Sequence, residues 1–430
     1  MGRKEEIVQL QNLGVKVPSF FRCPISLDVM KSPVSLCTGI TYDRSSIRRW
    51  LDSGNNTCPA TMQPLPSTDL VPNLTLQRLI NFWSGSAAAD TADLVPSHPA
   101  ADLLRDLSSS PNPAPCLRRL ADFLLDADNE DFDKNRLIAS GSCATTLTSV
   151  VNENASKIEI LEAGVRVLAL ILTAEFIEES NKKLVVSSLV SNLDSSVSSL
   201  LSLLKEGKNP DSRVDAARVL DSILTSFPDS RIPISEKPDL IPELIRLIGS
   251  TDEGIGKEKM DRSAIEAGLS CLVAISGVRR ARALMVKKGV VAAAKKILTA
   301  DVSMAPATAA EKALKLLEVA SGLPEGRSAI CESAEDFMGA ILGRMMKVGR
   351  KGTEAAVMVL WSVCHLFRDQ RAVEAVMAAN GGVTKILLLM QSDCSPAVRH
   401  MSGDLLKDFR VNSKSCIAGY DTKTTHIMPF

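Results

Sequence analysis

The chain has 430 residues, with 50 basic and 50 acidic side chains and four histidines. This length predicts two or three domains, or one domain followed by a repeat array. A hydrophobic content of 45% excludes a disordered chain. The formal net charge of zero offers no global field for nucleic acid, so we expect no nucleic-acid partner.

The first residues lack the apolar core of a signal peptide, and the charge-free apolar stretch 355–367 is too short to span a bilayer. The ten cysteines are scattered, mostly within Leu/Ala-rich segments, which predicts buried thiols and no disulfides. We therefore expect a cytoplasmic protein without stable membrane insertion, with the nucleus as an alternative compartment.

Aromatic residues and turn signals concentrate near the beginning of the chain, within residues 15–83. Ser-Pro, Thr-Gly and Ser-Gly-Asn-Asn turns and several prolines predict a small, loop-rich α+β domain with a hairpin and one or two short helices. Residues 84–100 are mostly Ser, Gly, Ala and Pro, a composition typical of a flexible linker.

Helical periodicity dominates residues 101–410. After a helix start at Asn209-Pro210, apolar side chains follow at spacings of three and four residues, which predicts an amphipathic helix. The stripe comprises Val214, Ala217, Val219, Leu220, Ile223 and Leu224.

Three such segments, 264–276, 310–322 and 355–367, can be laid over one another so that Leu272, Leu317 and Leu360 correspond. A glycine motif at Gly289 and Gly381 recurs between them, and residues 238–250 resemble it without the glycine. A repeat length between 40 and 50 residues predicts an all-α, armadillo-like superhelical array of about seven units. An irregular helical domain is the alternative. Residues 411–430 lose the periodicity and are predicted to form a C-terminal tail.

The N-terminal domain lacks the residues of a reaction centre. Residues 18–83 contain Cys23, Cys37 and Cys58 but no histidine and no C-x2-C pair, so we expect no zinc, no other metal and no cofactor. The nearest histidine, His98, lies in the linker, so this domain has no histidine that could act as a base to activate a thiol.

A protein-docking surface is the remaining interpretation of this domain. Ile47 and Leu51 lie four residues apart and face inward, which places Trp50 at the edge of the helix face. Two apolar loops carrying Ile25 and Pro59 would flank it and form a shallow groove for a protein partner. The alternative is that Trp50 belongs to the core.

These residues also form a pattern. The segments FRCPIS (21–26), TGITYDR (38–44), I-x-x-W-L (47–51), CP (58–59) and LVPN-x-x-L-x-x-x-I (70–80) resemble the U-box in order and spacing. With the repeats, nearly the whole chain resembles the plant U-box/armadillo E3 ubiquitin ligases. It is most similar to the short subgroup with an N-terminal U-box that is implicated in stress and immune signalling.

The resemblance implies a zinc-free, RING-like domain in which polar contacts replace metal ions. The candidates for that network are Asp28, Asp43, Arg44, Arg48 and Asn73, with Cys23 as a buried structural residue. It further implies that a ubiquitin-charged E2 enzyme binds Pro24, Ile25, Trp50, Pro59 and Gln63. Such a ligase orients the E2-bound ubiquitin for attack by a substrate lysine and forms no covalent intermediate.

One residue departs from the family pattern. Many U-boxes carry a cationic residue in the second loop, between E2 and ubiquitin, where this chain has Met62 followed by Gln63. We expect an active ligase that recruits protein substrates through the groove of its repeats. The alternative is a non-catalytic helical-repeat scaffold with an inert U-box-like head. By family analogy, homo-oligomerisation through the U-box is also expected.

Overall fold

The computed structural model describes residues 17–87, 104–107, 110–126, 129, 131–140, 142–249, 251–252, 259–301 and 305–417. The chain divides into two compact units, residues 1–102 with 127–136 and residues 103–126 with 137–430. Residues 88–100 of the predicted linker and residues 418–430 of the predicted tail lie outside the described residues.

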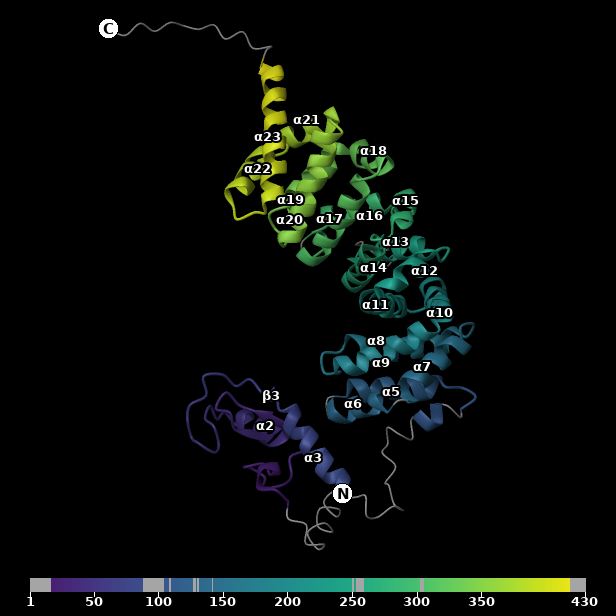
Figure 1. Ribbon diagram of the computed structural model, residues 1–430, viewed down its shortest axis with the longest axis vertical. Coiled ribbons are helices and arrows are strands. Elements are labelled where there is room, and N and C mark those ends of the chain that lie inside the picture. The colour runs from purple at the N-terminus through teal and green to yellow at the C-terminus, as the bar shows by residue number, and fades with distance from the viewer. Residues whose placement is uncertain are drawn as a thin grey trace, which may run out of the picture. The chain divides into compact units, whose positions relative to one another are not determined.

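The N-terminal domain contains a three-stranded antiparallel sheet in the order β2-β1-β3. Its strands are β1 (Pro33–Ser35), β2 (Thr41–Asp43) and β3 (Val71–Pro72). The helical elements are η1 (Ser19–Phe21), α2 (Arg44–Asp52) and α3 (Leu74–Ala87). The hairpin of β1 and β2 and these short helices confirm the predicted α+β domain (Figure 1).

A compact core holds this domain together. Ile47 on α2 is fully buried, as predicted, and Leu51 and Trp50 pack against the core while remaining partly exposed. Helix α3 continues to Ala87, past the predicted domain end at 83, because no proline follows until Pro96. The buried core residues are Phe21, Cys23, Met30, Val34, Leu36, Tyr42, Ile47, Cys58 and Ile80.

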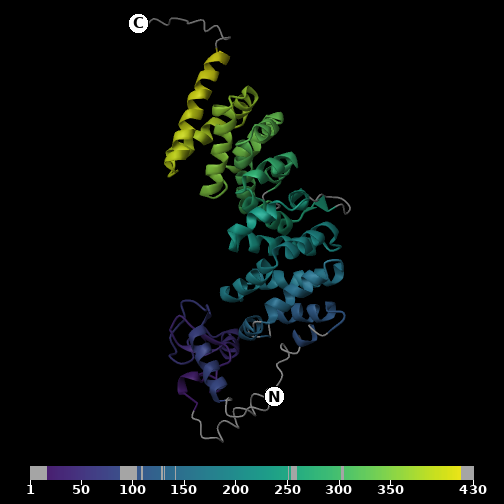
Figure 2. The same cartoon turned by 45° about the vertical axis from the view of Figure 1, so that its right-hand side comes forward.

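The second unit is a stack of helices (Figures 1 and 2). A short β4–β5 hairpin (Thr251–Asp252, Lys259–Met260) precedes α14. Helix α6 (Asp131–Ala139) is divided between the units, with residues 131–136 in the first. The helices of the second unit are α5 (Ala114–Leu125), α7 (Ser142–Glu153), α8 (Ile158–Thr173), α9 (Glu179–Ser191), α10 (Leu193–Glu206), α11 (Pro210–Ser226), η2 (Pro228–Ser230), α12 (Arg231–Ser235), α13 (Leu240–Gly249), α14 (Arg262–Ile275), α15 (Arg279–Lys287), α16 (Val290–Thr299), α17 (Ala307–Ser321), α18 (Pro324–Glu332), α19 (Ala334–Arg344), α20 (Arg350–Leu360), the π-helix η3 (Trp361–Leu366), α21 (Gln370–Ala378), α22 (Gly382–Gln391) and α23 (Pro396–Ile417).

Every third helix packs against the next, and we call this series the ladder. Its helices are α5, α8, α11, α14, α17, α20 and α23, which gives seven in the described part of the chain. A second series, α7, α10, α13, α16, α19 and α22, runs beside it in the same way. This three-helix repeat confirms the predicted armadillo-like array of about seven units.

One leucine of each ladder helix fills the interior. The predicted correspondence of Leu272, Leu317 and Leu360 fits the structure, because each is buried in the C-terminal half of one of three successive ladder helices, α14, α17 and α20. Burial of each such side chain contributes roughly 1.5–3 kcal/mol. The full series is Leu117, Leu168, Leu220, Leu272, Leu317, Leu360 and Leu405.

The repeated glycines stand where a helix begins from a left-handed residue. Gly289 (φ 91°) and Gly381 (φ 68°) precede α16 and α22. Asp239, in the segment that resembles this motif without the glycine, has the same conformation (φ 67°) before α13. Asp is one of the few residues besides glycine that visit this region. The side chain of Asp239 pairs with Lys205 on α10 (2.8 Å).

Helix α23 continues to Ile417, past the predicted end of the array at 410, since residues 404–417 contain neither glycine nor proline. Among the described residues, no single helix combines the length and apolar content that a membrane crossing needs. Two sharply bent pairs, α9 with α10 and α21 with α22, reach that threshold only when taken together.

Candidate functional site

Two loops of the N-terminal domain are built alike. Loop 1 (residues 22–29) is closed by a bridge between Arg22 and Val29, and loop 2 (residues 57–64) by one between Thr57 and Pro64. In loop 1, Cys23 N donates to Asp28 O and Leu27 N donates to Cys23 O, both at 2.8 Å. Loop 2 has the equivalent pair of backbone hydrogen bonds. The segments CPISLD (23–28) and CPATMQ (58–63) therefore adopt the same structural motif.

In loop 2 the equivalent bonds join Cys58 N to Gln63 O (2.9 Å) and Met62 N to Cys58 O (2.7 Å). Leu27 and Met62 occupy matching positions with positive φ angles of 62° and 56°. Both side chains project outward and are 67% and 65% exposed. The left-handed turn therefore presents one large apolar side chain at the tip of each loop.

Adjacent residues of β2 anchor the two loops. The backbone N–H of Asp43 donates to Cys23 Sγ in loop 1 (3.3 Å). The hydroxyl of Tyr42 accepts from Ala60 N (3.1 Å) and contacts Cys58 Sγ (3.0 Å) in loop 2. The position of both loops therefore depends on a single strand.

The carboxylate of Asp43 organises the start of α2. Its Oδ2 accepts from the backbone N–H groups of Lys31 (2.7 Å) and Ser32 (3.1 Å). Its Oδ1 accepts from both the N–H (3.1 Å) and the hydroxyl (2.7 Å) of Ser45, which caps the helix. Burial raises the pKa of Asp43, but these bonds, led by the one from the Ser45 side chain, outweigh it and hold the pKa below its usual value.

The thiol of Cys58 is inaccessible although it is polarised. Burial raises its pKa, but hydrogen bonds from Thr38, Thr61 and Tyr42 outweigh burial and lower the pKa to about 6. Burial and the contact with Cys58 raise the pKa of Tyr42. Cys58 and Cys23 are both 0% exposed, so neither sulfur faces a substrate, whereas Cys37 is exposed.

Trp50 connects α2 with loop 2. Its indole Nε1 donates to Thr57 O (2.8 Å), and Asn55 Nδ2 donates to Trp50 O (3.0 Å). The ring is partly exposed, so Trp50 lies at the edge of the core as the helix spacing predicts. The hydrogen bond to Thr57 fixes the indole at the base of loop 2.

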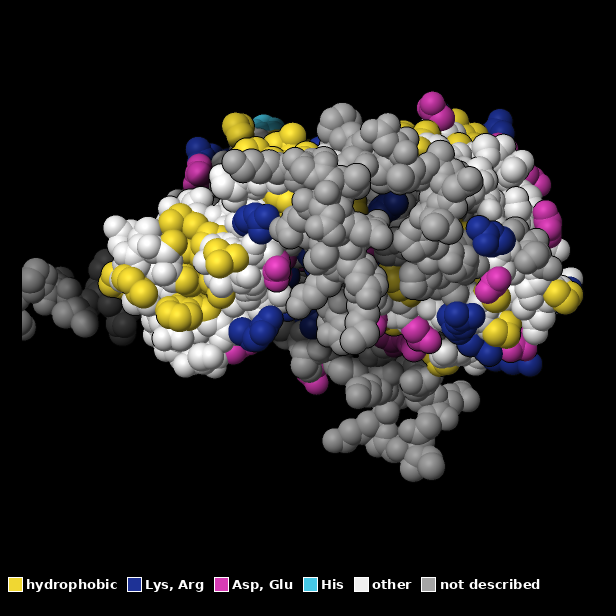
Figure 3. Space-filling view, turned by 90° about the horizontal axis from the view of Figure 1, so that it is seen from below, with side chains coloured by type: hydrophobic (Ala, Val, Ile, Leu, Met, Phe, Trp, Pro, Cys, Tyr) yellow, Lys and Arg dark blue, Asp and Glu magenta, His cyan; other side chains and the backbone are white. Residues whose placement is uncertain are grey.

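The other predicted docking residues lie on the two loops. Pro24 and Ile25 are exposed on loop 1, and Pro59 (partly exposed) and Gln63 (exposed) belong to loop 2. Figure 3 shows hydrophobic side chains gathered on the N-terminal domain, at the left of that view. Its exposed large apolar residues are Phe20, Ile25, Leu27, Met62, Val71, Leu74 and Leu79.

Asn73 belongs to a polar network of its own. It donates from Nδ2 to Thr41 Oγ1 (3.2 Å) and accepts Leu76 N at Oδ1 (3.1 Å), and its N–H donates to Pro33 O (2.8 Å). It therefore joins β1, β2 and α3. With Asp43, it supplies side-chain contacts of the kind that the resemblance implies.

The remaining candidates for that network contribute less. Asp28 accepts Cys23 N and Arg44 donates to Ser32 O (2.9 Å), in both cases through the backbone. The side chains of Asp28, Arg44 and Arg48 form no hydrogen bond or ion pair with another described residue. Within the described ranges, no three His, Cys, Asp or Glu side chains are placed to share a metal ion.

Sequence reasoning missed the roles of Leu27, Tyr42 and Thr57. The repeated Cys-Pro-x-Ser/Thr pattern was the available signal for the matching loops. The contacts of Tyr42 with Cys58 and of Thr57 with Trp50 depend on the folded arrangement, and no spacing in the sequence announces them.

In the helical array, polar side chains form contacts between neighbouring helices. Arg166 on α8 pairs with Asp215 on α11, and His365 on η3 contacts Asp408 on α23 at 2.7 Å. Thr308 on α17 donates to Glu266 on α14 (3.0 Å). These contacts give the ladder a polar surface above its leucine interior.

The fold and the paired loops define a class of protein, a U-box-like domain followed by armadillo-like repeats. The family model described as the U-box domain matches residues 17–88, and that of the plant U-box protein ARM repeat region matches residues 100–427. The chain therefore belongs to the plant U-box proteins with an armadillo (ARM) repeat region.

Curated relatives agree over the full length. The chain is 41% identical to U-box domain-containing protein 28 of Arabidopsis thaliana over 428 residues, with 96% of this chain and 98% of that protein covered. It is 28% identical over 402 residues to E3 ubiquitin-protein ligase PUB23 of the same plant, with 91% and 92% covered. The family thus includes named E3 ubiquitin-protein ligases.

Among solved structures, the fold resembles the crystal structure of an engineered protein. The TM-score is 0.50 at 20% sequence identity, and the match covers 76% of this chain and 71% of that one. At this identity the likeness concerns the fold alone.

Proposed function

We propose that the protein is a U-box E3 ubiquitin ligase whose two loops and helix α2 bind a ubiquitin-charged E2 enzyme. Loop 1 contributes Pro24 and Ile25, loop 2 contributes Pro59 and Gln63, and Trp50 connects α2 with loop 2. The observation that carries the proposal is the pair of loops, anchored by adjacent β2 residues and exposing apolar side chains. An exposed apolar patch on a rigid scaffold is suited to protein docking.

Transfer proceeds directly from E2 to a substrate lysine. Cys23 and Cys58 are fully buried, and the exposed Cys37 donates its thiol to Ser67 O (3.4 Å). The ligase contributes proximity and orientation of the thioester, and the lysine amine is the nucleophile. A Cys37→Ser variant is expected to keep full activity.

Met62 sets the mechanism apart from that of U-boxes with a cationic residue at this place. Its exposed thioether offers apolar contact but no hydrogen-bond donor to a ubiquitin carbonyl. Met62→Arg is expected to raise the rate of ubiquitin discharge from E2. If the native chain is inactive with every E2 tested and Met62→Arg is active, the native domain is an inert head on a helical-repeat scaffold.

The helical array recruits the substrate in this proposal. Its ladder exposes polar pairs along successive helices, a surface long enough to hold an extended segment of another protein. We place the activity in plant stress or immune signalling by analogy with the family. Homo-oligomerisation through the U-box and a cytoplasmic location belong to the same proposal.

The test is autoubiquitination in vitro with a panel of E2 enzymes. Ile25→Ala is expected to slow the reaction about tenfold or more, because it removes an exposed apolar contact at the proposed interface. Leu79→Ala removes a similarly exposed leucine from α3, outside the two loops and α2, and is expected to be neutral. Equal rates for the native chain and Ile25→Ala would refute the assigned surface.

A further inference from the structure

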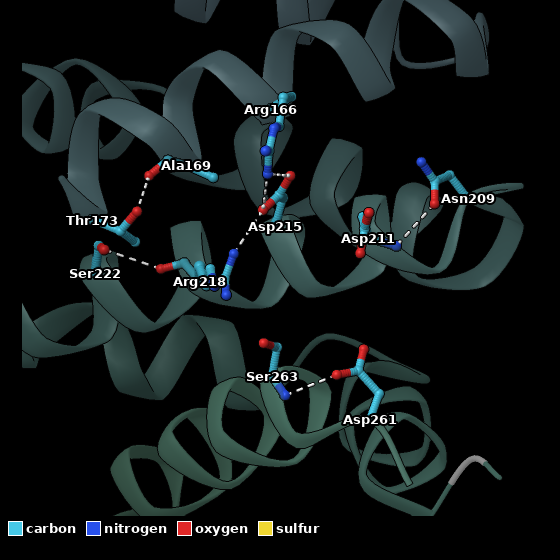
Figure 4. A network of polar contacts seen from close by, with 10 residues as sticks. All are labelled: Arg166, Ala169, Thr173, Asn209, Asp211, Asp215, Arg218, Ser222, Asp261 and Ser263. Atoms are coloured by element: carbon cyan, nitrogen blue, oxygen red, sulfur yellow. Dashed lines mark hydrogen bonds and ion pairs between the residues drawn. The ribbon is translucent and has the colours of Figure 1, made fainter. Parts of the chain in front are cut away.

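Two arginines from neighbouring ladder helices converge on one buried carboxylate (Figure 4). Arg166 Nη1 on α8 lies 3.0 Å from Asp215 Oδ2 and 3.3 Å from Oδ1. Arg218 Nη1, one turn further along α11, lies 3.2 Å from Asp215 Oδ1. The carboxylate is thus held at both oxygens.

Burial differs sharply within this cluster. The side chain of Asp215 is 2% exposed, whereas those of Arg166 and Arg218 are 42% and 36% exposed. Solvent therefore meets two guanidinium groups above a covered carboxylate. The three side chains sum to one positive charge, and the exposed part of the cluster is cationic.

Both arginines retain unused donors. Each guanidinium carries five N–H donors, and each uses only Nη1 toward Asp215. Within the described residues, the Nε and Nη2 groups of Arg166 and Arg218 have no hydrogen-bond acceptor. The buried Asp215 also restrains both side chains, which reduces the entropy lost when they bind a ligand.

The residues beside Arg166 and Arg218 differ in charge on the two sides of the cluster. Glu162, one turn before Arg166, is engaged with the N–H groups of Lys208 (2.9 Å) and Asn209 (3.3 Å) at the start of α11. In the other direction Figure 4 shows the hydroxyl-bearing residues Thr173 and Ser222. The acidic residues of α11 near the cluster are the exposed Asp211, one turn before Asp215, and the partly buried Asp221, one turn after Arg218. Burial raises the pKa of Asp221, and Lys312 and Thr225 oppose that effect.

The Arg118–Glu159 pair of the same ladder provides a contrast. It also joins two ladder helices, but both side chains are well exposed, at 58% and 69%. Its two charges cancel at the surface, so it offers no net attraction for an anion. The cluster at Asp215 differs from this pair because its carboxylate is buried, whereas its two guanidinium groups are partly exposed.

We propose that Arg166 and Arg218, positioned by Asp215, anchor the substrate by binding an oxyanion of an acidic or phosphorylated segment. Planar guanidinium groups suit the two-oxygen edge of a carboxylate or phosphate, which they bind bidentately. The inference rests on the proposed ligase function, since it names the substrate class that the array recruits.

The test uses the full-length protein and an immobilised library of short peptides with random flanks. The central residue is Ser, Asp, Glu or phosphoserine. The native chain is expected to retain the acidic peptides, and stronger retention of phosphoserine than of Asp and Glu assigns a phosphorylated segment as the ligand. Stronger retention of the Asp and Glu peptides assigns a carboxylate, and equal retention shows that the site binds either oxyanion.

The discriminating variant is Arg166→Gln/Asp215→Asn/Arg218→Gln. Replacing all three groups avoids leaving a buried unpaired charge. Retention of the acidic peptides is expected to fall about tenfold or more, because charge-assisted hydrogen bonds are lost. Arg118→Gln/Glu159→Gln is the matched control and is expected to bind like the native chain.

If the triple variant does not fold, Arg166→Lys/Arg218→Lys keeps the charges and removes the planar forks, and weaker retention is again expected. No preference for acidic peptides in the native chain, or a preference that survives these substitutions, would overturn the proposal. Autoubiquitination separates the two claims, because these variants leave the U-box unchanged and should retain it. Its absence in the native chain would refute the ligase function instead.

Discussion

In the N-terminal domain, a small core and hydrogen bonds from Tyr42 and Asp43 hold two irregular loops in place. In the helical array, every ladder helix buries at least one leucine and packs against the next ladder helix. The domain therefore depends on individual polar groups, each with its own partners. The stability of the array depends on a periodic apolar interior, to which each repeat contributes similarly.

We therefore expect the two units to unfold in separate transitions. A substitution in the ladder should lower the thermal transition of the array, and a substitution at β2 should lower that of the N-terminal domain. Scanning calorimetry of the full chain is suited to this comparison because it resolves transitions that are not cooperative with each other.

Leu272→Ala is expected to have the largest effect. The side chain is fully buried on α14 between neighbouring ladder helices, so truncation leaves a cavity and costs about 3 kcal/mol. Calorimetry should show the array transition at lower temperature, with the N-terminal transition in place. A parallel fall of both transitions would contradict the independence of the units.

Asp43→Ala is expected to destabilise the N-terminal domain by about 2 kcal/mol, because it uncaps α2 and leaves the N–H groups of Lys31 and Ser32 without an acceptor. The N-terminal transition in calorimetry measures the loss. Arg48→Ala, whose exposed side chain lacks a described partner, should change the stability by less than about 0.5 kcal/mol. Similar losses for the two variants would refute the assigned role of Asp43.

Gly289→Ala is expected to lower the free energy of unfolding of the array by about 1 kcal/mol, because an alanine is strained at a φ of 91°. No heavy atom lies within 4 Å of the added Cβ, so the cost is one of backbone conformation alone. The array transition in calorimetry measures it. Asp239→Gly, at the matching position before α13, removes only the exposed ion pair with Lys205 (2.8 Å) and relieves the left-handed backbone, so it should cost less than Gly289→Ala. An equal loss for the two variants would contradict the conformational explanation.

At Cys58 we expect a pH-dependent effect on the stability of the N-terminal domain. Its pKa is about 6 in the folded domain, below the ordinary value of 9.0. Between these values the unfolded chain holds a proton that the folded domain has released, so stability rises with pH and is lost as the pH falls toward 6. Urea midpoints of the N-terminal domain across this range should show the slope, and Cys58→Ser should flatten it. An unchanged slope in the variant would assign it to another group.

Much of the array could be predicted from the sequence because its information is periodic. The apolar spacing around Leu220 and the Asn209-Pro210 start define α11, and the glycines mark where α16 and α22 begin. The left-handed Asp239 shows why a motif without glycine still forms the same turn. Helix ends were harder, since α3 and α23 continue past their predicted limits where no residue stops them.

The N-terminal domain could be predicted only in outline. The motif spacing located Ile25, Trp50 and Asp43. The pairing of Tyr42 with Cys58, and of Arg166 with Asp215 in the array, joins residues far apart in the chain. Such contacts follow from three-dimensional packing, which no local pattern encodes.

A single-turnover assay of ubiquitin discharge from a charged E2 is the sharpest test of E2 binding by the two loops. The native chain is expected to accelerate transfer to free lysine, whereas Ile25→Ala should lose the acceleration and Leu79→Ala should keep it. No thiol-sensitive ubiquitin adduct should form on the chain. A thioester on one of its cysteines, or undiminished acceleration by a folded Ile25→Ala variant, would contradict these expectations.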